Sequence, residues 1–498
     1  MGLSLLDGAI IFVYLAGVTV AGTLIAGRQK TSREFFLGGR QLAWWAVGLS
    51  LVAGETSTLT FISIPGLAYT SDMRFLQLAF GYVIGRLLVS ALFIPSYYRG
   101  DLETAYDFLG KRFGLSLRRF TSLVFLLTRV LASGVRLFAT AIPVHLISGF
   151  SYATCIILIG GATIIYTSLG GLKAVVAMDV VQLVVYLGGA VASMALILHS
   201  LPHGWQDVSA IATHDGVNKF AVLHSSSGRG VMEFLATPYT LAGGLVGGTF
   251  LSMASHGTDQ LLVQRLLGCR TARDSQKALM LDAFCIVLQF AFFLLLGVCL
   301  FAFYHGASLQ SLGLASSDEI FPRFIVGQLP RGLLGLLIAA VLASAMGTLS
   351  SSISSLASST YLDIFRMPAV PAEGNERRSM RTSRVMTVFW GAALIGGAML
   401  FTDTRNPVVE LGLTIASFTY GGMLGTFLLG LFFVRTRESD AYVGFLTGCA
   451  VMTCVVLASP IDYTWHTVIG CAATIAAGCL SLGIRSLRRS RQAPSDRS

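Results

Sequence analysis

Many hydroxyl side chains lie inside one apolar stretch of the chain, residues 344–363. An unpaired hydroxyl is costly in hydrocarbon, so a membrane helix that carries so many needs partners for them. Either these small side chains allow neighbouring helices to pack closely, or their oxygens bind a dehydrated hard cation such as sodium. At 3.6 residues per turn, five of them share one helical face: Ser344, Thr348, Ser351, Ser355 and Ser358.

A second apolar stretch, residues 43–70, contains the acidic residue Glu55. A charge at mid-membrane costs at least roughly 2.5–3.5 kcal/mol, so a functional role is expected. Glu55 could bind sodium, pair with a cationic group of a solute, or pair with a buried arginine such as Arg129 or Arg136. A structural role is favoured for Arg86 and Arg129, whereas for Arg136 it is balanced against substrate binding.

The motifs of common enzyme classes are missing from the sequence. The eight cysteines form no CxxC pair, the histidines form no HExxH cluster, and neither a GxSxG nor a Walker loop occurs. We therefore predict that the protein is not an enzyme.

The elements that must position these residues are predicted membrane helices. Of the 498 residues, 54% are hydrophobic and 12% are charged, against about 25% charged in soluble proteins. We predict an all-α membrane protein with one transmembrane domain over residues 1–485 and a basic cytoplasmic tail over residues 486–498. Thirteen stretches can each cross roughly 30 Å of hydrocarbon: 6–27, 43–70, 75–97, 121–147, 152–169, 176–199, 234–260, 279–304, 332–362, 384–402, 408–433, 441–459 and 465–484.

The basic residues indicate the orientation of these spans. Most of the 35 Lys and Arg residues fall in connections on one side, and Arg265, in the connection after the span 234–260, is one of them. By the positive-inside rule, the N-terminus is outside and the C-terminus is cytoplasmic. We expect a multi-pass protein of the plasma membrane whose net charge of +10 reflects this topology. The partners expected are the lipid bilayer and a small-molecule solute, and no nucleic acid.

Two predicted spans look interrupted. Residues 43–70 contain Gly54, Pro65 and Gly66 beside Glu55, and residues 234–260 contain a run of glycines, LAGGLVGG. Paired Gly/Pro-interrupted spans point to a transporter built from an inverted repeat. Close helix packing through glycines explains the second span equally well. It does not explain why two interrupted spans occur at matching positions of the two halves.

These two spans stand five apart, so each would open a block of five helices. The predicted repeats cover about residues 43–199 and 234–433, and the peripheral helices cover 6–27, 441–459 and 465–484.

Six segments carry a resemblance to a known family. Over about residues 5–485 the chain resembles the sodium/solute symporter family, whose members carry sugars, proline, sialic acid, vitamins, iodide or choline. The resemblance implies a leucine-transporter-like fold and sodium-coupled uptake by alternating access. The segments are TSREFFLGGRQLAWW (31–45), SIPGLAYTSD (63–72), YTSLGGLKAVVAMDVVQ (166–182), TDQLLVQRLLGCRT (258–271), SSSISSLASSTYLDIFR (350–366) and FLLGLFFVRTRESDAYVGFLTG (427–448).

The resemblance also implies ion sites. The shared sodium site would use the carbonyls of Ala53, Thr56 and Ser344 and the hydroxyl of Thr348. The family pattern has a second hydroxyl residue just before this threonine, but Gly347 stands here. The site is therefore weaker, holds a water, or is completed by Ser351 or Glu55.

Some relatives bind a second sodium. The matching residues here are Asp179, Ser350 and Ser351. Asp179 is equally well interpreted as an acid at a helix end near the cytoplasm.

The solute is expected beside the breaks at mid-membrane. In sialic-acid relatives an arginine on the span 121–147 holds the solute carboxylate, which is the role considered for Arg136. The expected substrate residues are Glu55, Ser57, Thr60, Arg136, Thr249, Ser252, Thr414, Ser417 and Tyr420.

Two alternatives remain within the same fold, a solute sensor and a proton-coupled transporter. Both arise because a sodium ligand is missing at Gly347. The sequence does not specify the solute, the sodium stoichiometry or the oligomeric state.

Overall fold

The computed structural model describes residues 4–25, 27, 29–56, 58–216, 218–223, 230–400 and 408–492, and these residues form helices joined by connections without a β-strand. Short 3-10 and π turns supplement the α-helices. The α-helices are α1 (Leu5–Ile25), α2 (Ser32–Leu37), α3 (Trp44–Glu55), α4 (Thr58–Thr70), α5 (Leu76–Arg99), α6 (Ala105–Arg112), α7 (Leu115–Ser148), α8 (Tyr152–Ser200), α9 (Trp205–Ala212), α10 (Val231–Ala236), α11 (Gly248–Gly257), α12 (Gln260–Leu267), α13 (Ala272–Phe303), α14 (Ile320–Gln328), α15 (Leu333–Ser359), α16 (Glu376–Met399), α17 (Val408–Phe432), α18 (Glu438–Ala458) and α19 (Tyr463–Gln492).

Hydroxyl side chains start several of these helices. Thr104, Ser151 and Thr271 each accept a hydrogen bond from the backbone N–H three residues later. Each cap satisfies one of the donors that a helix start leaves free.

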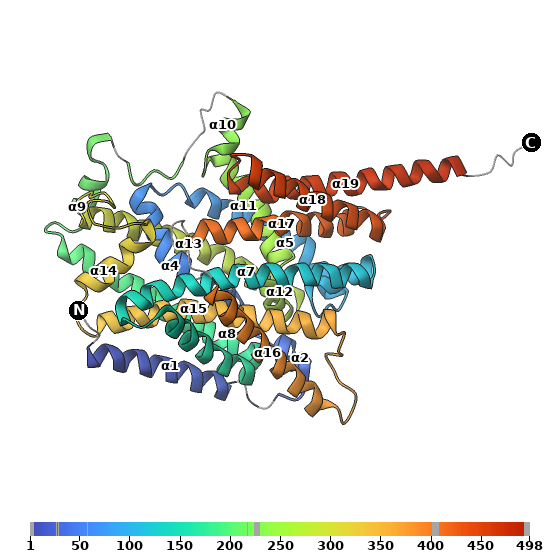
Figure 1. The fold of residues 1–498 in the computed structure, drawn as a ribbon, viewed down its shortest axis with the longest axis horizontal. Helices are drawn as coiled ribbons and strands as arrows, with labels where there is room; N and C mark the ends of the chain where they lie inside the picture. Colours follow the sequence, from blue (N-terminus) through green and yellow to red (C-terminus); the bar gives the residue numbers. More distant parts are fainter. Residues whose placement is uncertain are drawn as a thin grey trace, which may run out of the picture.

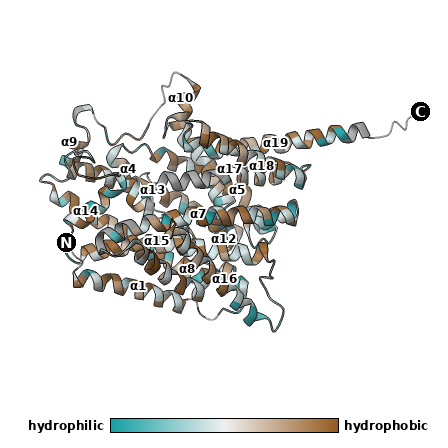
Figure 2. Ribbon diagram, viewed as in Figure 1, coloured by the Kyte–Doolittle hydropathy of each residue, from teal (hydrophilic) through white to brown (hydrophobic). Residues whose placement is uncertain are grey.

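The long helices run side by side along one direction, and apolar residues dominate their length (Figures 1 and 2). The start of α1 and the end of α19 lie at opposite ends of the bundle. Within the described ranges, eight helices are long and apolar enough to span a membrane, or nine if the bent pair α3 and α4 forms one span. The all-helical membrane architecture is thus confirmed, while the count of thirteen spans is not.

One helix combines two of the predicted spans. With 49 residues, α8 would extend about 74 Å if straight, more than twice the hydrocarbon thickness of roughly 30 Å. It bends at Gly171, whose backbone (φ 56°, ψ −160°) is not helical. A positive φ favours glycine, so the break falls between the predicted spans 152–169 and 176–199.

The first predicted interruption is a sharp break. α3 and α4 are bent by 58° relative to one another, and α3 ends at Glu55. The second takes a milder form, because a π-helical turn, η3 (Gly243–Gly247), leads directly into α11. The division into two repeats stays a prediction.

Helix α15 occupies the interior of the bundle. Every residue from Leu337 to Ser359 is buried. Hydroxyls toward its C-terminal end bond to carbonyls of the same helix, as Ser355 does to Ser352 (3.0 Å) and Ser358 to Ser355 (3.0 Å). In these C-terminal turns of α15 the hydroxyls therefore serve helix packing and do not point to a cation site.

Glycines allow α5 to touch η3 and α11 through their backbones. A Cβ added at Gly81 would lie 2.3 Å from the Gly244 carbonyl oxygen, and one at Gly248 would lie 2.5 Å from the Leu78 carbonyl oxygen. Both distances are far below van der Waals contact, so neither position tolerates a larger side chain without moving the helices.

Gly81→Val should lower the free energy of unfolding by about 1–3 kcal/mol, because the new side chain forces α5 away from α11. The measurement is thermal unfolding of the purified protein in detergent. Gly188→Val is the matched control, since nothing lies within 4 Å of a Cβ placed there. Equal stability of the two variants would contradict the close contact.

Candidate functional site

The break between α3 and α4 lies against the middle of α15. The Ser344 hydroxyl donates to the Thr56 carbonyl at 3.1 Å, and the Thr348 hydroxyl donates to the Ser344 carbonyl at 2.8 Å. A Cβ added at Gly347 would lie 3.8 Å from the Ala53 carbonyl oxygen. The four residues expected to bind sodium therefore lie together, although their role as ligands stays a prediction.

The end of a helix explains why this break suits a cation. The last four carbonyls of a helix lack intrahelical donors, and α3 ends at Glu55, so its final turn offers carbonyl oxygens. Thr56 itself is held in place, because its backbone N–H bonds to the Val52 carbonyl (2.9 Å) and its hydroxyl accepts from Gln289 (2.5 Å). The break is thus positioned from both α3 and α13.

An amide side chain fills the space beside Gly347. A Cβ there would lie 2.9 Å from Gln182 Oε1 and 3.5 Å from Asp179 Oδ1. The Gln182 oxygen therefore occupies the region where the family pattern places a hydroxyl. Sequence reasoning missed this residue, although it ends the segment YTSLGGLKAVVAMDVVQ.

A buried arginine joins two of the residues considered for a second sodium. Arg265 Nη2 lies 2.9 Å from Asp179 Oδ2 and also donates to the Ser351 hydroxyl. Ser50 completes this group, accepting from Arg265 Nε (2.7 Å) and donating to Asp179 (2.5 Å).

Arg265 was expected in a cytoplasmic connection, but its side chain is only 1% exposed. The guanidinium already provides one positive charge at Asp179. Ser350, the third residue, donates to the Gly347 carbonyl at 3.0 Å. A second sodium among these residues stays a prediction.

Glu55 is partly buried and belongs to a group of four ionisable residues from four helices, of which the other three are buried. Arg86 of α5 donates to Glu55 Oε2, and Arg86 Nε lies 3.1 Å from Asp282 Oδ2. His256 Nε2 of α11 lies 3.1 Å from Glu55 Oε1 and 3.3 Å from Asp282 Oδ2. Of the three roles considered for Glu55, pairing with a buried arginine is the one observed, and the partner is Arg86, not Arg129 or Arg136.

Two expected substrate residues on α11 bond to backbone carbonyls. The Thr249 hydroxyl lies 2.6 Å from the Leu245 carbonyl, and the Ser252 hydroxyl lies 3.1 Å from the Tyr82 carbonyl of α5. Both contacts hold α11 in place. Thr60 is buried near the break, and its substrate role stays a prediction. Ser57 and the side chains of Thr414 and Ser417 lie outside the described part of the chain.

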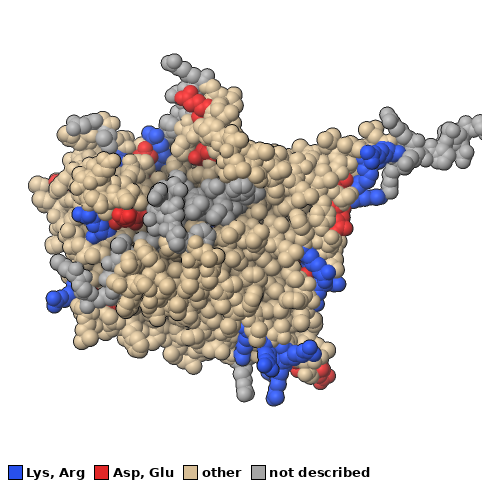
Figure 3. All heavy atoms as spheres, in the orientation of Figure 1, with Lys and Arg blue, Asp and Glu red and all other residues tan. Residues whose placement is uncertain are grey.

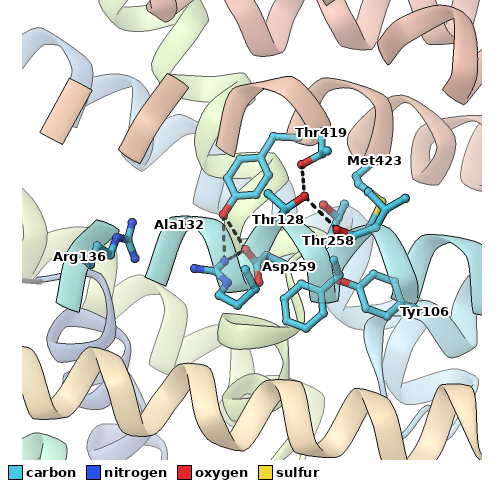
Figure 4. Close-up of a pocket in the computed structure, with 12 residues that line it drawn as sticks. Tyr106, Thr128, Ala132, Arg136, Thr258, Asp259, Thr419 and Met423 are labelled. Carbon is cyan, nitrogen blue, oxygen red and sulfur yellow. Dashed lines mark hydrogen bonds and ion pairs between the residues drawn. The ribbon is translucent and has the colours of Figure 1, made fainter. Parts of the chain in front are cut away.

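A second ion pair lines a cavity formed by α6, α7, α17 and the link between α11 and α12 (Figure 4). Arg129 is paired with Asp259. The Tyr420 hydroxyl donates to Asp259 Oδ2 at 2.5 Å and accepts from Arg129 at 3.3 Å. Tyr420, expected to contact the solute, thus completes this network.

Arg136 is partly buried and differs from the buried arginines Arg86, Arg129 and Arg265. It lines the cavity of Figure 4 and also a neighbouring cavity formed with Ser133, Thr140, Ala345, Thr348, Leu349 and Ser352. No acidic side chain among the described residues forms an ion pair with its guanidinium, and its Nε has no hydrogen-bond partner among them. A guanidinium for which the described residues supply no ion-pair partner therefore lines the same cavity as the expected sodium ligand Thr348.

Arg86→Met should lower the free energy of unfolding by about 3–5 kcal/mol, because it leaves two carboxylates in the membrane interior without their cation. Thermal unfolding in detergent measures the loss, and adding Glu55→Gln and Asp282→Asn should recover much of it. Arg74→Met is the control, since Arg74 is 39% exposed in its pair with Asp72 and such pairs contribute about 0–1 kcal/mol. Similar losses in both single variants would count against the buried network.

The sequence is similar to a known family of membrane transporters. The model of the sodium:solute symporter family matches residues 35–448. The chain is 28% identical to the sodium/sialic acid symporter SiaT of Proteus mirabilis, over 95% of this chain and 94% of that protein. It is 27% identical to the human sodium/iodide cotransporter and to the human sodium-coupled monocarboxylate transporter 2, over 96% and 92% of this chain and 73% of each relative.

Solved structures show the same architecture. A substrate-bound, outward-open Na⁺-coupled sialic acid symporter matches with a TM-score of 0.83 and 26% identity, over 97% of this chain and 98% of that chain. The nucleobase-cation-symport transporter MHP1 in a closed conformation shares the fold, with a TM-score of 0.57 and 15% identity over 92% of this chain and 96% of that one. The predicted leucine-transporter-like fold is confirmed. The chain therefore belongs to the sodium:solute symporter family, and it is a multi-pass membrane protein that couples transport of a small solute to sodium by alternating access.

Proposed function

We propose that the transported solute is a small polar carboxylate whose negative charge binds Arg136. The observation that carries this proposal is the lack of an acidic partner for Arg136 among the described side chains, in contrast to Arg86, Arg129 and Arg265. Arg136 is partly buried, and a charge withdrawn from water without a partner is costly, so a solute that supplies the counter-charge gains affinity from the pairing.

The chemistry of the guanidinium supports a carboxylate. Its planar array of donors matches the two oxygens of a carboxylate, which gives strong and directional pairing. Two kinds of relatives support the same solute class, since their names specify sialic acid and monocarboxylates. The carboxylate of the solute would thus bind at Arg136, close to Thr348, which lines the same cavity.

The coupling ion would bind directly beside this solute. We propose that the carbonyls of Ala53, Thr56 and Ser344 and the hydroxyl of Thr348 bind sodium, and that Gln182 Oε1 supplies the oxygen that Gly347 cannot. Because Thr348 borders both the ion and the solute cavity, each ligand should raise the affinity for the other, as thermodynamic reciprocity requires.

Sodium entry would then drive uptake from outside. The membrane potential contributes about 2.3 kcal/mol per charge per 100 mV. We propose a plasma-membrane protein with its N-terminus outside, its C-terminus in the cytoplasm and no enzymatic activity. The evidence for the orientation is the bias of Lys and Arg toward one set of connections.

Thr348→Ala and Gln182→Ala should each raise the sodium concentration for half-maximal uptake by about tenfold, the effect of losing roughly 1.4 kcal/mol of ion binding. In the Gln182→Ala background, Gly347→Ser should recover part of the affinity by restoring a hydroxyl.

Uptake into proteoliposomes under an imposed sodium gradient measures both effects. Ser355→Ala is the control, because its hydroxyl bonds within α15. An unchanged sodium dependence in Thr348→Ala would remove this residue from the ion site, and accumulation driven by a proton gradient alone would replace sodium with protons.

Arg136→Gln should reduce carboxylate uptake at least 100-fold, whereas Arg136→Lys should retain part of it, because the charge remains but the planar donor pair is lost. Thermal-shift screening of carboxylates, sugars, amino acids and quaternary amines, with and without sodium, identifies the ligand for this assay. If the stabilising ligand carries no negative charge, or if Arg136→Gln transports it normally, the carboxylate assignment is wrong. Stabilisation without sodium-driven flux would identify a sensor.

A further inference from the structure

A basic groove opens at the N-terminal end of α16, away from the transport cavities. One wall is α16 itself, and the other is formed by the connection after α1 and by α8 just before its bend. Lys and Arg side chains gather over this end of α16 (Figure 3). The lining residues are Gln29, Lys30, Ser168, Leu169, Glu376, Arg377, Met380, Arg381, Arg384, Val385 and Val388.

The positive charge in this groove is concentrated and largely uncompensated. Arg377, Arg381 and Arg384 follow one another at i, i+4 and i+7, so they share one exposed face of α16. Lys30 stands on the opposite wall, and among the described residues Glu376 is the one acid that lines the groove. None of the four cations forms an ion pair with a described acidic side chain. The groove therefore fits an anionic group that several basic side chains can reach together.

The same face of α16 changes from basic to apolar within one turn. Val385 and Val388 are 59% and 46% exposed, and Leu169 across the groove is 45% exposed. An anion alone would use only the charged end. A ligand with an anionic head and a hydrocarbon tail would use the whole length.

We propose that this groove is a binding site for an anionic glycerophospholipid of the cytoplasmic leaflet. The phosphate would lie among Arg377, Arg381 and Arg384, and an acyl chain would follow Val385 and Val388. Basic residues at the cytoplasmic end of membrane helices attract anionic headgroups by about 1 kcal/mol each. The site lies outside the transport cavity, so the inference does not depend on the identity of the solute.

The location indicates what the lipid does for the fold. Gln29 Nε2 donates to the Gly170 carbonyl at 2.5 Å, next to the bend at Gly171. A lipid in the groove would therefore join three separate segments at that bend: α16, the middle of α8 and the connection after α1. Its binding should stabilise this end of the bundle.

The test uses the full-length protein, delipidated in a neutral detergent, with thermal unfolding and native mass spectrometry as readouts. The probes are dioleoylphosphatidylglycerol, dioleoylphosphatidylcholine and inorganic phosphate. The anionic lipid should raise the unfolding temperature and remain bound in the mass spectrum, whereas the zwitterionic lipid and free phosphate should do neither at the same concentration.

The variant Arg377→Gln/Arg381→Gln/Arg384→Gln should weaken binding of the anionic lipid by roughly 100-fold. The control is Arg99→Gln/Arg119→Gln/Arg435→Gln, which removes three exposed arginines that do not line the groove. Val385→Asn/Val388→Asn removes the apolar part of the groove and keeps its cations. This variant should also weaken binding of the anionic lipid.

Three results would overturn the site: equal lipid binding by the groove and control variants, equal stabilisation by free phosphate, or an unchanged lipid affinity in the valine variant. If the triple Arg→Gln variant does not fold, as shown by the loss of its unfolding transition, lipid binding to Val385→Asn/Val388→Asn in the mass spectrum decides whether the groove is the site.

Discussion

The structure depends on the contact between a helix end and a helix that is buried on all sides. α15 has no exposed face from Leu337 to Ser359, so each of its hydroxyls needs a partner within the protein. Near its C-terminal end the partners are carbonyls of the same helix. At Ser344 the partner is the Thr56 carbonyl at the end of α3, where a helix terminus leaves carbonyls free. The end of α3 thus supplies an acceptor for a hydroxyl of α15. Oxygen atoms of both helices therefore lie in the same region.

Buried charges help to determine which helices pack around the contact between the end of α3 and α15. Arg86, Arg129 and Arg265 each pair with acids from other helices. Removing one partner of such a pair exposes an uncompensated charge to a poor solvent, at a cost of several kcal/mol. The arrangement of helices that satisfies all three arginines is therefore strongly preferred. Arg136 has no ion-pair partner among the described acids, which is why we propose it as the position where a solute supplies the missing charge.

One of these buried networks links four helices that adjoin the contact. Glu55, Arg86, His256 and Asp282 join α3, α5, α11 and α13 into one unit. The expected sodium ligands come from α3 of this unit and from α15 outside it. An ion bound there would lie where the end of α3 meets α15, and it would favour the arrangement in which these two helices are in contact. This gives alternating access a physical basis, since a ligand shifts an equilibrium only by its different affinity for the two states.

Hydropathy and short-range spacing were sufficient to predict an all-helical membrane protein, an interruption near Glu55 and a hydroxyl face from Ser344 onward, because each depends on residues close together in the chain. The partner of Glu55 was not predictable in this way. Asp282 and His256 lie in the other half of the sequence. Arg86 lies 31 residues from Glu55, and nothing in its local sequence distinguishes it from Arg129 or Arg136 as a partner. The same holds for Arg265, which looked like a loop residue, and for Gln182 beside Gly347. Local sequence selects the elements, whereas the pairing of buried charges is settled when helices distant in the chain pack together and must neutralise one another.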